Sequence, residues 1–294
     1  MYTSELSEKK PGLFILSGLC LSLMAFLYYA VFKSLIQDWI QLPDFSHGFF
    51  VPFVAAYFAW EKREEIEAAE ISPNNSGLVI LLMGLSLLIL GRAASEYFTM
   101  RFSFLVVLTG AIVFLCGYKY LKVLGFPLFF LVFMIPVPSI IIDKITSPLQ
   151  FFASSFAESW IDSIGIPVLR EGNVIHLANS SLEVAEACSG IRSFVCLVGL
   201  GTAFAYYARK TLFPRLFLIL SCIPIAILVN AFRVTLTGVL ASYFGSSVAE
   251  GFFHSFSGYF LFAVALLLLL LLNFALNFFV GIHRRGAENT EENS

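Results

Sequence analysis

Long apolar segments separated by short polar stretches make up most of this chain. A helix that crosses a membrane needs about 20 consecutive apolar residues, with about 17 as the lower limit. Eight segments meet or approach this length, at residues 12–35, 45–61, 76–95, 101–119, 123–142, 189–208, 215–240 and 253–282. We therefore expect an all-α polytopic membrane protein with about eight transmembrane helices.

The polar stretch between the fifth and sixth segments, residues 143–187, carries two further patterns. Apolar side chains recur there at steps of three and four, at Leu149, Phe152, Phe156 and Trp160. This spacing predicts an amphipathic helix that lies on the membrane surface. Two short β-prone runs then flank residues 178–181, and they predict a small β-hairpin that ends directly at Cys188.

The composition excludes several classes of protein. The chain is 59% hydrophobic and only 13% charged, whereas soluble domains carry roughly 25% charged residues. So much apolar surface cannot be hidden in a water-soluble core, so the lipid bilayer is the first expected partner. The net charge of −2 gives no reason to expect nucleic acid. The five cysteines are not at metal-ligand spacings, so we expect no metal, disulfide framework or cofactor.

The basic residues indicate how the chain is oriented. If both termini are cytoplasmic, 11 of the 18 Lys and Arg residues lie on the cytoplasmic side and five on the other side. Cytoplasmic segments are enriched in Lys and Arg, so we adopt this orientation. Residues 143–187 then lie outside the cytoplasm. We expect a single integral membrane domain over residues 1–285 and a disordered cytoplasmic tail over residues 286–294.

A cysteine with charged neighbours stands at the start of the sixth segment. In E-A-C-S-G-I-R-S, residues 186–193, Cys188 lies between Glu186 and Arg192. Arg192 is one helical turn beyond Cys188 and so shares its face of the helix. A nearby guanidinium favours the thiolate, which is the nucleophilic form of cysteine. The alternative is that Cys188 is a small hydrophobic residue, an interpretation that suits the other four cysteines in their apolar surroundings.

Two polar residues, Asn230 and Arg233, lie in the seventh segment. Arg233 follows 17 uncharged residues that begin after Arg215, and as a helix these measure roughly 27 Å, close to the hydrocarbon thickness. Arg233 is therefore expected near the extracytoplasmic boundary, at the depth of Cys188, with Asn230 one turn inward. The pair indicates a helix face turned into the bundle. The alternative is an arginine that extends to the lipid headgroups.

A histidine, His254, begins the eighth segment at the same boundary, with Ser257 one turn below it. A lone histidine there could be a contact to lipid headgroups. A thiol, an imidazole and a guanidinium at one depth on three helices instead suit acyl transfer. The thiol attacks a carbonyl, the imidazole transfers protons, and the guanidinium stabilises the oxyanion or the thiolate.

A fourth polar group lies at the start of the second segment, in the stretch D-F-S-H-G-F-F-V-P. It comprises Asp44, Ser46 and His47. These side chains could bind a substrate or line the site. They could equally form the N-terminal cap of a helix, because Asp and Ser are favoured cap residues.

Taken together, these stretches resemble the exosortase/archaeosortase family of polytopic membrane transpeptidases. The resemblance rests on L-E-V-A-E-A-C-S-G-I-R-S at 182–193, N-A-F-R at 230–233, H-S-F-S-G at 254–258 and F-S-H-G-F-F-V-P at 45–52. It implies that Cys188 is the nucleophile, Arg233 the stabilising arginine and His254 the acid/base. Histidine at that position favours the bacterial exosortase branch, which implies a cell inner-membrane enzyme with its site at the periplasmic face.

The resemblance also implies the substrates. These are membrane-anchored proteins with a C-terminal sorting signal, made of a Pro-Glu-Pro motif, one membrane span and a basic tail. The enzyme would cleave near the motif through a thioester and pass the new C-terminus to an acceptor that the sequence does not identify. Supporting or substrate-binding roles are expected for Arg192, Asn230, Glu186, Glu183, Ser189, Ser257, His47 and Ser46. Arg192 is the alternative to Arg233 as the stabilising arginine.

Two other functions remain open at this point. An intramembrane cysteine protease would use the same residues with water as the acceptor. A transport or assembly protein for exopolysaccharide would use Arg192 and Arg233 to bind an anionic ligand, and it predicts polar residues deep in the bundle. The polar residues of this chain crowd one end of the helices, which disfavours a conduction path.

Overall fold

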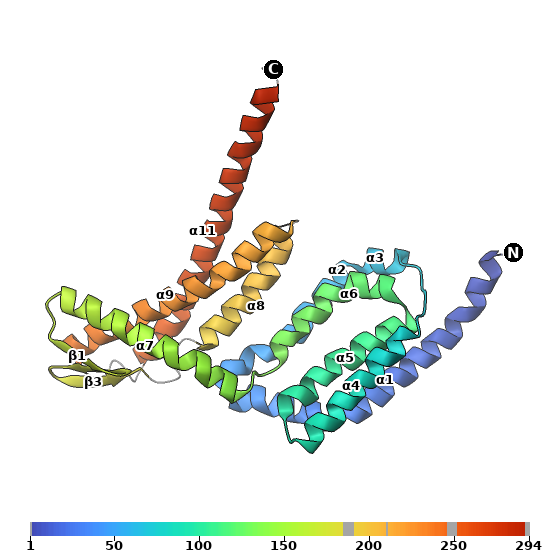
Figure 1. The fold of residues 1–294 in the computed structure, drawn as a ribbon, viewed down its shortest axis with the longest axis horizontal. Coiled ribbons are helices and arrows are strands. Elements are labelled where there is room, and N and C mark those ends of the chain that lie inside the picture. The colour runs from blue at the N-terminus through green and yellow to red at the C-terminus, as the bar shows by residue number, and fades with distance from the viewer. Residues whose placement is uncertain (1, 185–190, 210, 246–251, 292–294) are drawn as a thin grey trace. The chain divides into compact units, whose positions relative to one another are not determined.

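The computed structural model describes residues 2–184, 191–209, 211–245 and 252–291 (Figure 1). Within these ranges, the backbone alone is described for residues 2–17, 43, 191–192, 252–257 and 279–291. The chain divides into two compact units, Met1–Pro138 and Ser139–Ser294. Both units are mostly helical, which confirms the predicted all-α class.

The first unit is a set of helices joined by short turns. Its elements are α1 (Tyr2–Gln41), η1 (Pro43–Phe49), α2 (Val51–Glu61), α3 (Arg63–Ala68), α4 (Ser76–Ala93), α5 (Tyr97–Leu115), α6 (Tyr118–Phe130) and η2 (Leu131–Met134), where η marks a 3₁₀ helix. α4 and α5 form an antiparallel pair, α1 packs on α5, and α2 packs on α6 (Figure 1).

Glycines allow α4 and α5 to approach closely. A Cβ atom on Gly77 would lie 2.2 Å from the backbone nitrogen of Phe114. A Cβ atom on Gly84 would lie 2.6 Å from Cγ2 of Val107. Neither position has room for a side chain. Small residues bring membrane helices into backbone contact, where van der Waals packing stabilises their association.

The start of α5 is organised by an acidic residue and an arginine. The carboxylate of Glu96, the N-cap residue, accepts hydrogen bonds from the backbone N–H groups of Phe98 at 2.9 Å and Thr99 at 2.6 Å. Burial raises the pKa of Glu96, but these hydrogen bonds and the nearby Arg101 outweigh burial and lower the pKa below its usual value. Arg101 is 3% exposed and pairs with Asp38 of α1 at 2.6 Å. The charge pair therefore ties α1 to α5.

The second unit contains helices and a small antiparallel sheet. Its elements are α7 (Ser139–Ser163), β1 (Val168–Glu171), β2 (Val174–Leu177), β3 (Ser180–Glu183), α8 (Ile191–Ala208), α9 (Leu212–Phe244) and α11 (Phe252–Glu291). The strands lie in the order β1-β2-β3. The predicted hairpin is confirmed as β2–β3, and β1 is a further strand that the sequence analysis missed. The turn into β2 uses Gly172, whose φ of +65° suits a tight turn between paired strands.

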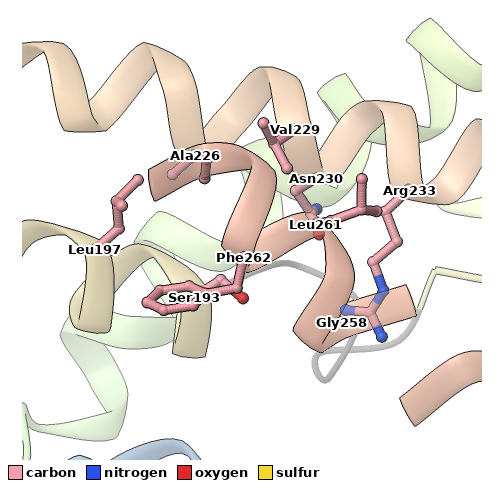
Figure 2. Close-up of a pocket in the computed structure, with 10 residues that line it drawn as sticks. Ser193, Leu197, Ala226, Val229, Asn230, Arg233, Gly258, Leu261 and Phe262 are labelled. Carbon is pink, nitrogen blue, oxygen red and sulfur yellow. The ribbon is translucent and has the colours of Figure 1, made fainter. Parts of the chain in front are cut away.

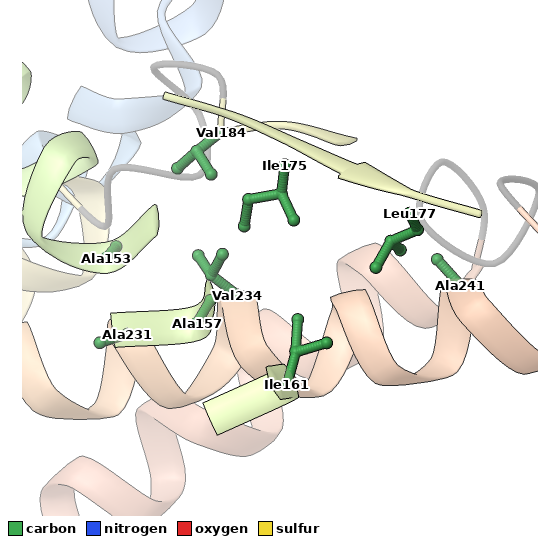
Figure 3. Packing of buried hydrophobic residues seen from close by; sticks show 9 residues of the cluster. All are labelled: Ala153, Ala157, Ile161, Ile175, Leu177, Val184, Ala231, Val234 and Ala241. Atoms are coloured by element: carbon green, nitrogen blue, oxygen red, sulfur yellow. The ribbon is translucent and has the colours of Figure 1, made fainter. Parts of the chain in front are cut away.

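The inner face of the sheet packs on α7 and α9 (Figure 3). The buried residues of this core are Ala153, Ala157, Ile161, Ile175, Leu177, Val184, Ala231, Val234 and Ala241. α7 and α9 meet closely at Gly238, where a Cβ atom would lie 2.6 Å from Cδ1 of Ile161. The core therefore fixes the sheet on the half of α9 that carries Arg233.

α7 contains the predicted amphipathic helix. Its small residues Ala153 and Ala157 face the core. The predicted aromatic stripe lies beside them, with Phe152 44% and Trp160 56% exposed. Both rings contact Phe156, at centroid distances of 6.1 and 5.8 Å. Small residues thus face the protein, and the exposed aromatic stripe suits a membrane interface.

Five of the described helices are long and apolar enough to cross a membrane. They are Gly18–Gln41, Ser76–Ala93, Tyr97–Leu115, Leu212–Phe244 and Gly258–Phe278. They coincide with the first, third, fourth, seventh and eighth predicted segments. The sixth predicted segment contains a shorter apolar helix, Ser193–Ala208. The polytopic class is therefore confirmed.

The second and fifth predicted segments are not continuous helices. Residues 45–61 contain most of η1 and then α2, whose 11 residues measure only about 16 Å. Within residues 123–142, α6 ends at Phe130, and the next α-helix starts at Ser139. Prolines coincide with these interruptions, at Pro43, Pro52, Pro136 and Pro138. Proline lacks an N–H group and disfavours helical backbone in the residue before it, so an apolar run there does not form one long helix.

Candidate active site

Part of the predicted chemistry lies outside the described residues. This applies to Glu186, Cys188 and Ser189, which fall within residues 185–190. For three further candidates the backbone belongs to a helix but the side chain is not described: Arg192 on α8, and His254 and Ser257 on α11. The arginine side of the predicted site, with Asn230 and Arg233, is described in full.

A pocket lies where α8, α9 and α11 meet (Figure 2). Its lining residues are Ser193 and Leu197 of α8, Ala226, Val229, Asn230 and Arg233 of α9, and Gly258, Leu261, Phe262 and Ala265 of α11. The pocket is small, and the space that the centre of a water-sized molecule can occupy in it is only about 20 Å³. These are the three helices on which the sequence places the arginine, the histidine and, three residues before α8 begins, the cysteine.

The pocket is polar at one end and apolar at the other. On α9, Arg233 and Ala226 are seven residues apart, which is about 10 Å along the helix. On α8, Ser193 and Leu197 are one turn apart, with the polar Ser193 at the end of the pocket that contains Arg233 and the apolar Leu197 at the other end. A guanidinium, an amide and a hydroxyl thus stand at one end of the pocket, while the floor is aliphatic. A buried apolar wall strengthens the electrostatic effect of the few polar groups beside it.

The guanidinium of Arg233 lies against the backbone of α11. A Cβ atom built on Gly258 would be 3.8 Å from both Cζ and Nη2 of Arg233. Figure 2 shows the arginine extending from α9 toward this glycine. Gly258 is four residues, or one turn, beyond His254 on the same helix. The backbone of α11 therefore brings position 254 within about one helical turn of the guanidinium.

The residues on either side of the segment that contains Cys188 belong to ordered elements. On one side Val184 is 2% exposed, and its N–H donates to the carbonyl oxygen of Asn173 at 2.9 Å. On the other side α8 begins at Ile191. Five residues separate Cys188 from Ser193, so its Cα lies within roughly 18 Å of a residue that lines the pocket. Glu183, a predicted supporting residue, is exposed at the end of β3.

His47 and Ser46 lie in η1 of the first unit. Nε2 of His47 is 3.2 Å from the carbonyl oxygen of Phe133, so the histidine contacts η2. The N-caps of η1 and α2 are Leu42 and Phe50, and neither makes a side-chain cap bond. The alternative interpretation, that Asp44 or Ser46 is an N-cap, is therefore wrong.

The sequence analysis missed Ser193 as a pocket residue. It stands directly after Arg192, where an isolated hydroxyl enters an otherwise apolar helix, and that contrast could have identified it. Among the described residues, no three His, Cys, Asp or Glu side chains gather as a metal site would require.

One protein-family model, described as transmembrane exosortase, matches residues 39–271. The match covers well over half of the chain and includes all the predicted site residues, from Ser46 to Ser257. The chain belongs to the transmembrane exosortase family. Searches of curated proteins and of solved structures found no match. Family membership confirms the resemblance drawn from the motifs and gives this exosortase a general role as a membrane transpeptidase in protein sorting.

Proposed function

We propose that this exosortase cleaves the C-terminal sorting signal of exported membrane-anchored proteins and transfers them to an acceptor. The signal is a Pro-Glu-Pro motif followed by one membrane span and a basic tail. The observation that carries this proposal is the pocket on α8, α9 and α11, which puts Arg233 beside the helix of His254 and at the end of α8 that follows Cys188. Family membership gives the class of reaction.

The proposed reaction proceeds through a thioester. The Cys188 thiolate attacks the carbonyl carbon of the scissile peptide bond, and Arg233 stabilises the oxyanion. The C–N bond then breaks, and His254 donates its proton to the departing amine, leaving an acyl group on the sulfur. The acceptor loses a proton to His254 and attacks the thioester, which releases the cysteine as thiolate.

The position of the site suits such a substrate. Arg233 lies 18 residues from Arg215 on α9, which is about 27 Å of helix and close to the hydrocarbon thickness. A protein anchored by one helix presents the residues beside its span at this depth. Glu183, Glu186, Ser189, Arg192, Asn230 and Ser257, with Ser46 and His47 of the first unit, are the proposed supporting residues. We place the enzyme in the cell inner membrane, with this end of α9 at the periplasmic face.

Replacement of the nucleophile tests the mechanism. We expect Cys188→Ala to abolish cleavage of a tagged reporter that carries the sorting signal, because the proposed thioester forms on this sulfur. Cys196→Ala is the matched control, since it removes a thiol from the apolar part of α8, and it should process the reporter normally. The measurement is the electrophoretic shift of the reporter at equal membrane levels of each variant. Normal cleavage by Cys188→Ala would rule out the thiol mechanism.

The acceptor decides between transfer and hydrolysis. Mass spectrometry of the mature reporter should show an added mass on its new C-terminus if an acceptor has attacked the thioester. A free carboxylate would instead identify the chain as a protease that uses water. The transport alternative gains no support from this pocket, because its floor at Leu197, Ala226 and Ala265 is apolar.

A further inference from the structure

A second cluster of arginines lies at the opposite end of the same helices. Arg209 directly follows α8, and Arg215 stands in the first turn of α9. Arg209 is 7% exposed. Its Nη1 donates to Oδ1 of Asn277 at 2.9 Å, and its Nη2 donates to the carbonyl oxygen of Asn273 at 2.8 Å. A buried arginine thus joins the end of α8 to the middle of α11.

Arg215 covers the end of α8. Its Nη2 donates to the carbonyl oxygens of Arg209 at 2.8 Å and Tyr206 at 3.4 Å, and its guanidinium carbon lies 4.8 Å from the centre of the Tyr206 ring. The last carbonyls of a helix carry partial negative charge, which suits an arginine. The Nε atoms of both arginines are buried and have no hydrogen-bond partner among the described residues. These contacts orient the two guanidinium groups, but they provide no counter-charge.

No carboxylate of the described residues neutralises this cluster. Neither Arg209 nor Arg215 takes part in an ion pair with a described residue. The sequence explains why: from Ile191 to Ala287 there are seven Lys and Arg residues, but Glu250 is the only acidic residue. Glu250 comes after α9 in the sequence, and the last residue of α9, Phe244, is already about 44 Å along the helix from Arg215. Buried charge requires compensation, and the described carboxylates do not supply it, so a bound anion would complete the cluster.

The amino end of α9 adds further donors to the cluster. Its N-cap residue, Thr211, makes no side-chain cap bond, so it leaves the N–H groups of the first turn without that partner. Helix N-termini attract anions through these groups and the helix dipole. From this point apolar side chains continue along α9 at steps of four, with Leu212 67%, Leu216 46% and Leu220 60% exposed. A cationic site therefore adjoins an exposed apolar strip.

We propose that Arg209, Arg215 and the amino end of α9 bind the phosphate group of an anionic membrane phospholipid. Guanidinium groups and helix N-termini both recognise phosphate oxygens. The exposed leucines of α9 provide a surface along which acyl chains can lie. Phospholipid is favoured over free phosphate because the site joins charge and apolar surface at the end of a membrane helix.

Native mass spectrometry of the purified full-length protein tests this site. We would add phosphatidylglycerol or phosphatidylcholine in matched detergent and count the retained lipids. We expect retention of phosphatidylglycerol, and a loss of affinity of about fivefold for each arginine removed in Arg209→Gln with Arg215→Gln. The matched control is Lys62→Gln with Arg63→Gln, which removes two cations from the turn between α2 and α3 and should retain the lipid.

Three results would contradict the proposal. Equal retention of phosphatidylglycerol by the double variant would overturn the site, and equal retention of phosphatidylcholine would overturn the need for an anionic lipid. Displacement of the lipid by inorganic phosphate at similar concentration would assign the site to free phosphate. If the double variant does not fold, Arg215→Gln and Arg215→Lys replace it. The lysine variant should keep the lipid and the glutamine variant lose it, and identical retention would again overturn the site.

Discussion

At the scale of single residues, the position of Arg233 depends on a residue without a side chain. The guanidinium lies at ordinary van der Waals distance from the place of a Cβ atom on Gly258, so the glycine leaves space for it rather than holding it. Asn230 and Ser193 complete the polar end of the pocket. Charge alone would identify none of Gly258, Asn230 and Ser193 as important, yet in the proposed mechanism they bound the space where a substrate carbonyl meets Arg233.

Substitutions of Gly258 test whether the Arg233 guanidinium must occupy its observed position for processing. Gly258→Ala adds one methyl at 3.8 Å from the guanidinium, which is normal contact, so we expect processing within about twofold of the parent. Gly258→Leu would displace the guanidinium, and we expect processing to fall at least about tenfold, since small misplacements of catalytic groups have large effects. The measurement is the initial rate of reporter cleavage at equal protein level. A leucine variant as active as the parent would show that Arg233 does not work from this position.

At the scale of helices, glycine spacing determines the tightest packing of the first unit. Gly77, Gly84 and Gly91 recur at every seventh residue of α4, and a side chain at any of them would clash with α5. The interval of seven keeps one face of a helix toward its partner for several turns. These glycines lie within an apolar segment. Its composition predicts a membrane helix but does not show which face of that helix packs against a partner.

Enlargement of one of these glycines should separate α4 from α5. We expect Gly84→Leu to lower the free energy of unfolding by about 1–3 kcal/mol, because the new side chain overlaps Val107. Gly125→Leu on α6 is the control, since nothing lies within 4 Å of a Cβ atom at that position. Thermal unfolding in detergent should show a lower midpoint for Gly84→Leu alone. Equal effects of the two substitutions would contradict the close α4–α5 packing.

At the scale of the whole molecule, α9 of the second unit contributes both to the core beneath the sheet and to the pocket with α8 and α11. The sheet lies on α7 and α9 through Ile175 and its neighbours (Figure 3). The chain leaves this sheet at Val184 and reaches α8 at Ile191, with Cys188 between them. In the sequence, the proposed nucleophile therefore lies between the end of the sheet and the start of α8, an order that suits the proposed cleavage of a peptide beside its membrane span.

Weakening the sheet should reduce both stability and processing. Ile175 is fully buried, so Ile175→Ala should lower the free energy of unfolding by about 2–5 kcal/mol. Leu169 is 59% exposed on the neighbouring strand, and Leu169→Ala should change stability by less than about 1 kcal/mol. Thermal unfolding measures the change in stability, and the rate of reporter cleavage measures the change in processing. Normal cleavage by a destabilised Ile175→Ala protein would show that the sheet does not position Cys188.

Some elements of this fold can be predicted from residues that are close together in the sequence. The long apolar helices, the amphipathic part of α7 and the β2–β3 hairpin were predictable because each depends on residues close together in the chain. Strand β1 was missed because its four residues are strand only by pairing with β2. The segments at 45–61 and 123–142 were predicted as single helices because hydropathy does not register the effect of proline on backbone hydrogen bonds.

The sequence by itself determined the membrane class, the family and the residue types of the proposed chemistry, because apolar length and the cysteine, arginine and histidine motifs are local properties. Only the tertiary structure decided that α8, α9 and α11 form one pocket, that Gly258 accommodates Arg233, and that Arg209 and Arg215 share one end of the bundle. These facts depend on the packing of residues far apart in the chain. Packing is set by the shapes of side chains on several helices at once, which no single segment contains.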